Sequence, residues 1–327
     1  MVTRLRSEAG FSLAEVLVAT GLMLVVSSIV TGALLQMSNH QQTIWNRTEM
    51  HSGVRGATEL LQQEVGQAGR ITLPAAVTLN TTVPGGNPCA AATVTVTSTT
   101  GMFVGEWLTT FDGDSSETFA VTAIPSATTL TACFTRSHTV VAGSPISIAV
   151  LGGFATGIVP PTGIANGSTA NKLKLYGDIN GDGNMVYVEY TCDNGDAGTA
   201  GSFNLYRNIM AFDTPAAAKP ALTNSMILLS NVHSNPADAS GAARPCFQYQ
   251  TVPVTVGGTP YTLVIDVAVT LTAWTQARDL ITKQFQTETK ALLNVSPRNV
   301  GFTSQFAGLA YNNRVQPTPP TVTALLP

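Results

Sequence analysis

Apolar residues run almost without interruption near the start of the chain and then continue at helical spacing. In residues 11–35 the only formal charge is Glu15, and such a run is long enough to cross a bilayer core about 30 Å thick as a helix. Residues 36–69 contain no proline, and their apolar residues recur mostly every three or four positions. One helix is therefore predicted over residues 13–67, apolar all round in its first half and amphipathic in its second, with Gly69 as its C-terminal cap.

After this helix the pattern changes to a period of two, in which apolar residues alternate with Thr or Ser. In residues 71–151 this alternation, interrupted by glycines, predicts half-buried strands that form a small β-barrel or sandwich. Residues 152–171 are predicted to be a linker or long loop, and residues 172–315 the main antiparallel β head. The near-continuous apolar run of residues 260–273 is expected to be its central strand. The Pro/Thr-rich residues 316–327 are predicted to form a flexible tail.

The predicted fold class is therefore α+β, a long N-terminal helix packed on an antiparallel β-sheet head with an inserted small β-barrel or sandwich. A chain of 327 residues has ample material for a core beyond the helix. Only 11 % of the residues are charged and the net charge is -3, so no nucleic-acid partner is expected.

Four cysteines, Cys89, Cys133, Cys192 and Cys246, all follow the helix, and none forms a C-x-x-C pair. An even number at wide spacing, in a region that the predicted topology places outside the cytoplasm, favours two disulfides over a metal site. Three pairings are open. We favour Cys89 with Cys133 and Cys192 with Cys246, because each bond then closes within one β region; four free thiols are the alternative.

Two features separate the apolar run from an ordinary secretory signal. The Gly10-Phe11 step precedes the run, whereas a secretory signal places its cleavage site after it. A carboxylate at Glu15 is costly in hydrocarbon and indicates a function with a specific partner. A simple signal anchor is the alternative interpretation.

The segment G-F-S-L-A-E, Gly10 to Glu15, followed by an apolar helix, resembles the processing and assembly signature of type IV prepilins and secretion pseudopilins. The resemblance implies a cytoplasmic leader, residues 1–10, which a prepilin peptidase removes between Gly10 and Phe11. It implies N-methylation of Phe11 and a helix over residues 11–70, with residues 11–35 as the transmembrane segment and later the filament core. It also implies that Glu15 faces an N-terminal amine in that core.

Further segments resemble PilW-like minor pilins: residues 64–70, residues 204–207 and residues 287–300. The resemblance implies a single-pass inner-membrane protein with a cytoplasmic N-terminus and a periplasmic head, which later enters a pilus or pseudopilus. Prepilin peptidase, other pilin subunits and the inner membrane are then the expected partners.

Asp178, Asn180, Asp182, Asn184 and Glu189 occupy the oxygen-ligand spacing of a twelve-position calcium loop, with a glycine at position six. The flanking residues have the pattern of strands rather than helices. Because successive side chains of a strand point to opposite faces, Glu189 need not point at the loop. A calcium ion is the candidate cofactor, and a metal-free hairpin turn is the alternative.

The leading functional hypothesis is a minor pilin or pseudopilin, a structural subunit of a type IV pilus or type II secretion filament. The alternative is a pilus-tip or surface adhesin with a calcium-stabilised head, whose partner would be a surface ligand. An enzyme is not expected, because the chain lacks the nucleophile, zinc and phosphate-loop motifs.

Overall fold

The computed structural model describes residues 10–193, 203–280, 282–309 and 311–325. Residues 1–9, which hold most of the predicted leader, lie outside the described residues. The chain divides into two compact units, residues 1–51 with 275–286 and residues 52–274 with 287–327.

Helix α1 is a single helix over Leu13–Gln67, which confirms both predicted ends. The chain leaves it through Gly69, whose φ of +87° lies in the left-handed region that favours glycine. A Cβ atom at Gly69 would lie 2.9 Å from the carbonyl oxygen of Ala155, so the close approach of a neighbouring segment also requires glycine there. The predicted C-terminal cap is confirmed.

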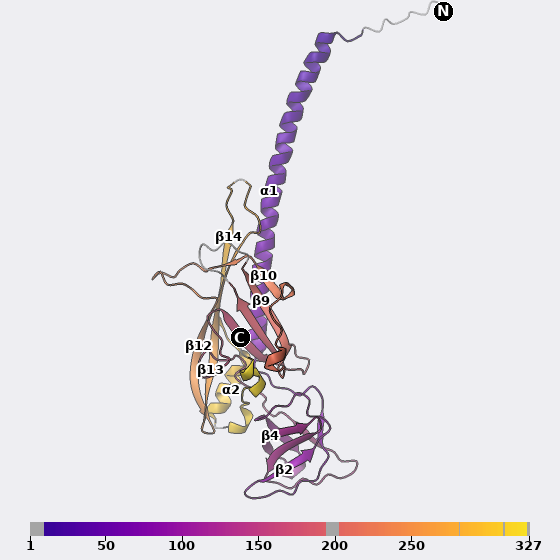
Figure 1. The fold of residues 1–327 in the computed structure, drawn as a ribbon, viewed down its shortest axis with the longest axis vertical. Coiled ribbons are helices and arrows are strands. Elements are labelled where there is room, and N and C mark those ends of the chain that lie inside the picture. Colours follow the sequence, from indigo (N-terminus) through magenta and orange to yellow (C-terminus); the bar gives the residue numbers. More distant parts are fainter. Residues whose placement is uncertain (1–9, 194–202, 281, 310, 326–327) are drawn as a thin grey trace, which may run out of the picture. The chain divides into compact units, whose positions relative to one another are not determined.

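The last turns of α1 bury one stripe in the second unit. Val54, Ala57, Leu61, Val65 and Ala68 are each at most 2 % exposed, and their spacing of three and four residues places them on one helix face. This part of α1 lies beside strands β9 and β10 (Figure 1). The predicted amphipathic half of the helix therefore packs on the β head.

The first six strands form one antiparallel sheet in the order β1-β6-β3-β4-β5-β2. A bridge between Leu79 and Val96 joins the two edges, so the sheet closes into a small barrel, one of the two predicted alternatives. Its core holds Leu108, Phe119 and Phe134. The strands are β1 (Val77–Leu79), β2 (Ala90–Thr95), β3 (Trp107–Phe111), β4 (Thr118–Ser126), β5 (Thr129–Phe134) and β6 (Ile146–Ala149).

The head has two further antiparallel sheets. The first has the order β10-β9-β8-β7; in the second, β13 pairs with β11, β12 and β14, as expected of the predicted central strand. The strands are β7 (Lys172–Gly177), β8 (Val186–Cys192), β9 (Asn204–Ala211), β10 (Ile227–Ser230), β11 (Val232–His233), β12 (Phe247–Val256), β13 (Thr259–Trp274) and β14 (Thr287–Val295). Two short helices follow, α2 (Arg298–Gly308) and α3 (Pro320–Ala324).

The prediction of a flexible tail over residues 316–327 is wrong for residues 316–325. Val322 and Leu325 are fully buried in the head core, and the Gln316 side chain is also fully buried. The Gln316 amide accepts a hydrogen bond from the Trp107 N–H and donates one to the Trp107 carbonyl, both at 2.8 Å. The tail therefore joins the barrel to the head. Its Pro/Thr composition suggested flexibility, but the buried apolar side chains and the hydrogen bonds of Gln316 hold it in place.

Residues 152–171 form a long loop, one of the two predicted alternatives, and this loop is packed on the head rather than free. Ala155, Ile158, Val159 and Asn166 are fully buried. Ile158 also bridges Leu175 at the edge of β7, and its backbone neighbours share hydrogen bonds with that strand. The segment therefore covers the sheet even though it has no regular secondary structure of its own.

Candidate functional site

The N-terminus of α1 is closed by a reciprocal cap between Ser12 and Glu15. The Ser12 N–H donates to the Glu15 carboxylate at 3.0 Å, and the Glu15 N–H donates to the Ser12 hydroxyl at 3.2 Å. This arrangement is a capping box, which satisfies two backbone donors that the helix itself leaves unpaired. Gly10 and Phe11 immediately precede the cap, and the Phe11 side chain is 87 % exposed. The predicted cleavage position is therefore at an open helix start.

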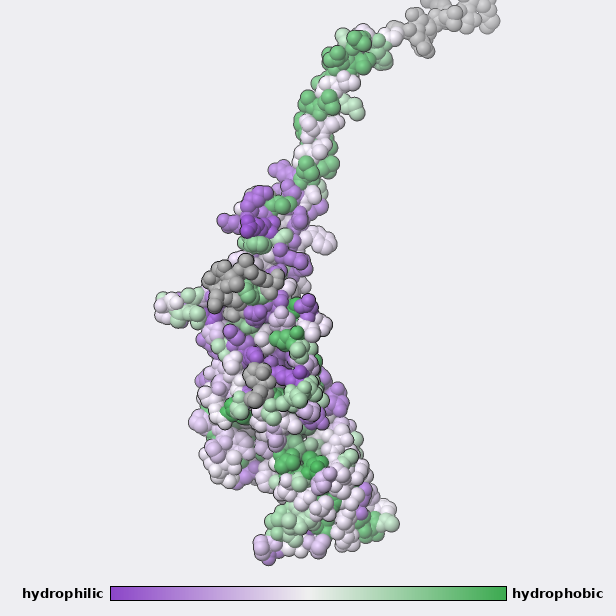
Figure 2. All heavy atoms as spheres, viewed as in Figure 1, coloured by the Kyte–Doolittle hydropathy of each residue, from purple (hydrophilic) through white to green (hydrophobic). Residues whose placement is uncertain are grey.

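The first half of α1 exposes apolar surface on every side. Every large apolar side chain from Phe11 to Leu35 is at least 50 % exposed, and Figure 2 shows them along this part of the helix. The hydroxyls of Thr20, Ser28 and Thr31 donate to backbone carbonyls three or four residues earlier in the helix. These polar groups are thus satisfied internally, as an apolar surrounding requires. By length and hydropathy this helix could be a membrane anchor or a signal sequence.

A buried ion pair holds the other half of α1 to the head. The Arg207 guanidinium from β9 donates from Nε to Glu64 at 3.0 Å, and a further hydrogen bond joins its Nη2 to the same carboxylate. The Tyr190 hydroxyl from β8 donates to Glu64 as well. Burial opposes the charge of Arg207, but the hydrogen bonds and charge of Glu64 outweigh it and raise the pKa of Arg207. Arg207 therefore stays charged, and the contacts of Glu64 with Arg207 and Tyr190 join α1 to two neighbouring strands.

The aspartate loop connects β7 to β8 and is organised around its carboxylates. The Asp178 carboxylate accepts from the Asp182 N–H at 3.0 Å, and the Asp182 carboxylate accepts from the Asn184 N–H at 2.9 Å. Gly183 has a φ of +85°, as the predicted sharp turn requires. Asp178 is buried, whereas Asn180, Asp182 and Asn184 are exposed. The second oxygen of Asp178 lies 3.9 Å from Nε of Arg70, so a hard cation in the loop would compete with this ion pair.

Glu189 does not join these loop residues. It lies three positions along β8 from Val186, about 10 Å at the usual rise of a strand. Its carboxylate accepts from the Lys219 ammonium at 2.7 Å and from the Tyr187 hydroxyl at 3.0 Å. Burial opposes its charge, but these hydrogen bonds and the charge of Lys219 lower the pKa of Glu189. Among the described residues, no group of three or more His, Cys, Asp or Glu side chains forms a metal site.

Both favoured cysteine pairs are at bonding distance. Cys89 and Cys133 have an S–S distance of 1.94 Å, and Cys192 and Cys246 one of 1.98 Å. The first bond ties β5 to the segment before β2 within the barrel, and the second ties the end of β8 to the start of β12. The favoured pairing is therefore confirmed, with each bond inside one β region.

In the barrel, the His138 side chain lies between two partly buried carboxylates. His138 is fully buried between Asp112, 3.0 Å from its Nδ1, and Glu117, 2.9 Å from its Nε2. The Thr135 and Arg136 backbone N–H groups also donate to Glu117. These contacts attach the loop between β3 and β4, which holds Asp112 and Glu117, to the segment that follows β5.

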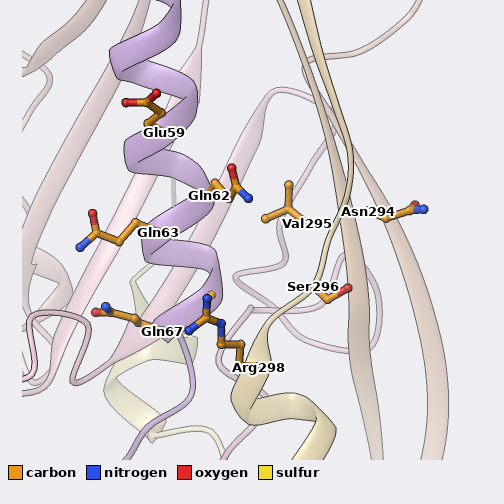
Figure 3. A pocket seen from close by; sticks show the side chains of 9 residues that line it. Glu59, Gln62, Gln63, Gln67, Asn294, Val295, Ser296 and Arg298 are labelled. Carbon is orange, nitrogen blue, oxygen red and sulfur yellow. The ribbon is translucent and has the colours of Figure 1, made fainter.

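A polar pocket of about 330 Å³ lies between the end of α1 and the junction of β14 with α2. Figure 3 shows Gln62 of α1 and Val295 of β14 pointing toward one another across it. Amide side chains dominate its lining, and Arg298 is its one cationic side chain. The lining residues are Glu59, Gln62, Gln63, Gly66, Gln67, Asn294, Val295, Ser296 and Arg298. These groups can hydrogen-bond a ligand, and the hydroxyl of Ser296, one of them, donates to the Asp266 carboxylate.

No protein-family model, curated protein or solved structure matches the chain.

We predict that Glu64→Gln destabilises the attachment of α1 to the head. The variant leaves the Arg207 guanidinium without its counter-charge in a mostly buried site, and breaking such a pair typically costs about 3 kcal/mol or more of unfolding free energy. Guanidinium unfolding of the detergent-solubilised chain measures the loss. Glu59→Gln is the matched control on the same helix, because the Glu59 side chain is 62 % exposed and its pair with Arg55 is worth little. Equal unfolding midpoints for the two variants would contradict the anchoring role of Glu64.

Proposed function

We propose that the chain is a minor pilin or pseudopilin, a structural subunit of a type IV pilus or type II secretion filament. One observation carries the proposal: a continuous helix exposes apolar surface on all sides in its first half, with a single carboxylate near its start, and is fixed to a β head in its second half. Exposed apolar surface of this extent is unstable in water, so this half requires a lipid or protein surrounding. A bilayer before assembly and a bundle of like helices afterwards meet that requirement.

The proposed assembly step depends on the charge of Glu15. Residues 11–35 contain no Lys, Arg or His, so this helix segment offers Glu15 no cationic side chain. The Ser12 cap supplies hydrogen bonds but no counter-charge. Cleavage between Gly10 and Phe11 would create an amine at the start of the same helix, and N-methylation would keep it cationic. Pairing of Glu15 with that amine, on its own or a neighbouring subunit, compensates the charge and sets the axial register.

The proposed topology follows from the same helix. The leader stays in the cytoplasm, where prepilin peptidase removes it, residues 11–35 span the inner membrane, and the head folds in the periplasm. The two disulfides support this placement, because such bonds persist in oxidising compartments. The other pilin subunits are the partners of the assembled state.

We further propose that the aspartate loop binds calcium through Asp178, Asn180, Asp182 and Asn184, without Glu189. The support is the spacing of the oxygen-bearing side chains along the loop and the turn at Gly183; Glu189 is left out because it pairs with Lys219. A cation there would brace the connection between β7 and β8.

The charge of Glu15 can be separated from its capping role. Glu15→Gln keeps a side-chain acceptor for the Ser12 N–H but removes the negative charge, whereas Ser12→Ala removes the reciprocal cap and keeps the charge. We expect Glu15→Gln to insert and to be processed, but to fall at least about tenfold in sheared filaments, because the partner amine is left buried and unpaired. Immunoblotting of membrane and filament fractions measures both steps. Ser12→Ala should enter filaments, and normal incorporation of Glu15→Gln would remove the mechanism.

Calorimetric titration of the full-length chain with calcium tests the loop. Asp182→Ala should weaken binding at least about tenfold, because ligand charge sets the affinity of such sites. Glu189→Gln should leave the binding heat unchanged. Identical heats for the wild type and Asp182→Ala would show that the loop is a metal-free turn.

A further inference from the structure

Strand β7 carries a lysine in the interior of the protein, and the residues before and after it are also buried. Lys174 stands between Leu173 and Leu175, and its side chain is fully buried. Its ammonium group donates to the side-chain carbonyl of Asn166, Nζ to Oδ1, at 2.6 Å. A buried lysine is normally paired with a carboxylate, because an uncompensated charge is costly in the interior. Here the hydrogen-bond partner is a neutral carboxamide.

Asn166 is itself fully buried and held in place by its amide nitrogen. Nδ2 donates to the Val322 carbonyl at 2.9 Å and to the Tyr187 hydroxyl at 3.2 Å. The Tyr187 hydroxyl in turn donates to Glu189 at 3.0 Å. The carboxamide is therefore fixed between the amine of Lys174 and a hydroxyl that is hydrogen-bonded to a carboxylate.

Glu189 faces Lys174 directly across the strand pair. The two residues are register partners in β7 and β8, so their Cβ atoms are about 5 Å apart on the same face of the sheet. Tyr187 lies on that face too, two positions before Glu189. The tail and the segment of residues 155–168 cover this face. Amine, carboxamide, hydroxyl and carboxylate thus share one enclosed site.

We propose that Lys174 and Asn166 form an intramolecular isopeptide bond. The Lys174 Nζ attacks the Asn166 Cγ, the Cγ–Nδ2 bond breaks, and Nδ2 leaves as ammonia. The amine and the carboxamide become one secondary amide and one ammonia molecule, so no oxidant, reductant or other reactant is needed. The bond joins the covering segment of residues 155–168 covalently to strand β7.

The geometry suits this step. Cγ is bonded to the Oδ1 atom that Nζ already contacts, so a small rotation brings Nζ to the separation of about 3–3.5 Å from which attack occurs. Burial, partly offset by the charge of Glu189, lowers the pKa of Lys174 to about 8, which makes the neutral, nucleophilic amine accessible near neutral pH. Glu189 accepts the proton that Nζ loses, and a proton passes through the Tyr187 hydroxyl to the departing Nδ2. Glu189 and Tyr187 therefore end in the protonation states in which they began.

The mass of the purified full-length chain tests the bond. With both disulfides reduced, the wild type is expected to be one ammonia, about 17 Da, lighter than the mass calculated for its sequence with the same N-terminus, which is the full mass below. After reduction, trypsin should cut after Lys172 but not after Lys174, and the fragment with Asn166 should stay joined to the fragment that starts at Leu173. This second readout is independent of N-terminal processing and therefore of the proposed function.

Variants identify the reacting atoms. Asn166→Ala and Lys174→Arg should restore the full mass and, in the arginine variant, cleavage after residue 174. Asn166→Asp should form the same product with loss of water instead of ammonia. Tyr187→Phe should accumulate unlinked chain, and Lys172→Arg, next to the site, should link like the wild type. A wild-type chain at its full sequence mass, or one cut after Lys174, overturns the proposal whether or not any variant folds.

Discussion

One continuous helix has to meet two different surroundings, and the rest of the structure depends on this constraint. The first half of α1 is apolar on every side, so it cannot be covered by a sheet that packs on one face only. The second half has a single buried stripe that matches such a sheet. The head can therefore hold only the second half, and Glu64 makes this attachment specific, since its carboxylate meets Arg207 of β9 and Tyr190 of β8 at once.

The sheet of β7 to β10 carries buried charges on both faces. On the face toward α1, Glu64 and Arg207 satisfy each other and fix the position of the helix. On the opposite face, Lys174 meets Asn166, while Glu189 pairs with Lys219. Because ionic groups are tolerated in a core only when they are paired or hydrogen-bonded, each cluster dictates which segment lies above it. The covering segments, residues 155–168 and 316–325, are irregular in backbone and yet fixed by these contacts.

The sequence predicted the parts of the fold that depend on local periodicity. The periodicity predicted both ends of α1 and the central strand β13, and the cysteine spacing favoured the pairs that form. The alternating pattern predicted a small barrel or sandwich, and the bridge between Leu79 and Val96 makes it a barrel. The tail was mispredicted because composition does not reveal that Gln316 matches the backbone of Trp107. At the candidate sites, Glu189 was grouped with the calcium loop by spacing, whereas its actual partner Lys219 lies thirty residues later. Likewise, the alternation of residues around Lys174 predicts a strand, but nothing in the sequence indicates that Lys174 contacts Asn166.

We propose that α1 is an assembly element exposed by processing rather than a permanent anchor. Mass spectrometry of the N-terminal peptide of the chain purified from its native cells tests this claim most directly. We expect the mature chain to begin at Phe11 with a methylated amine. A chain that begins at Met1, or one cut after the apolar segment, would contradict it.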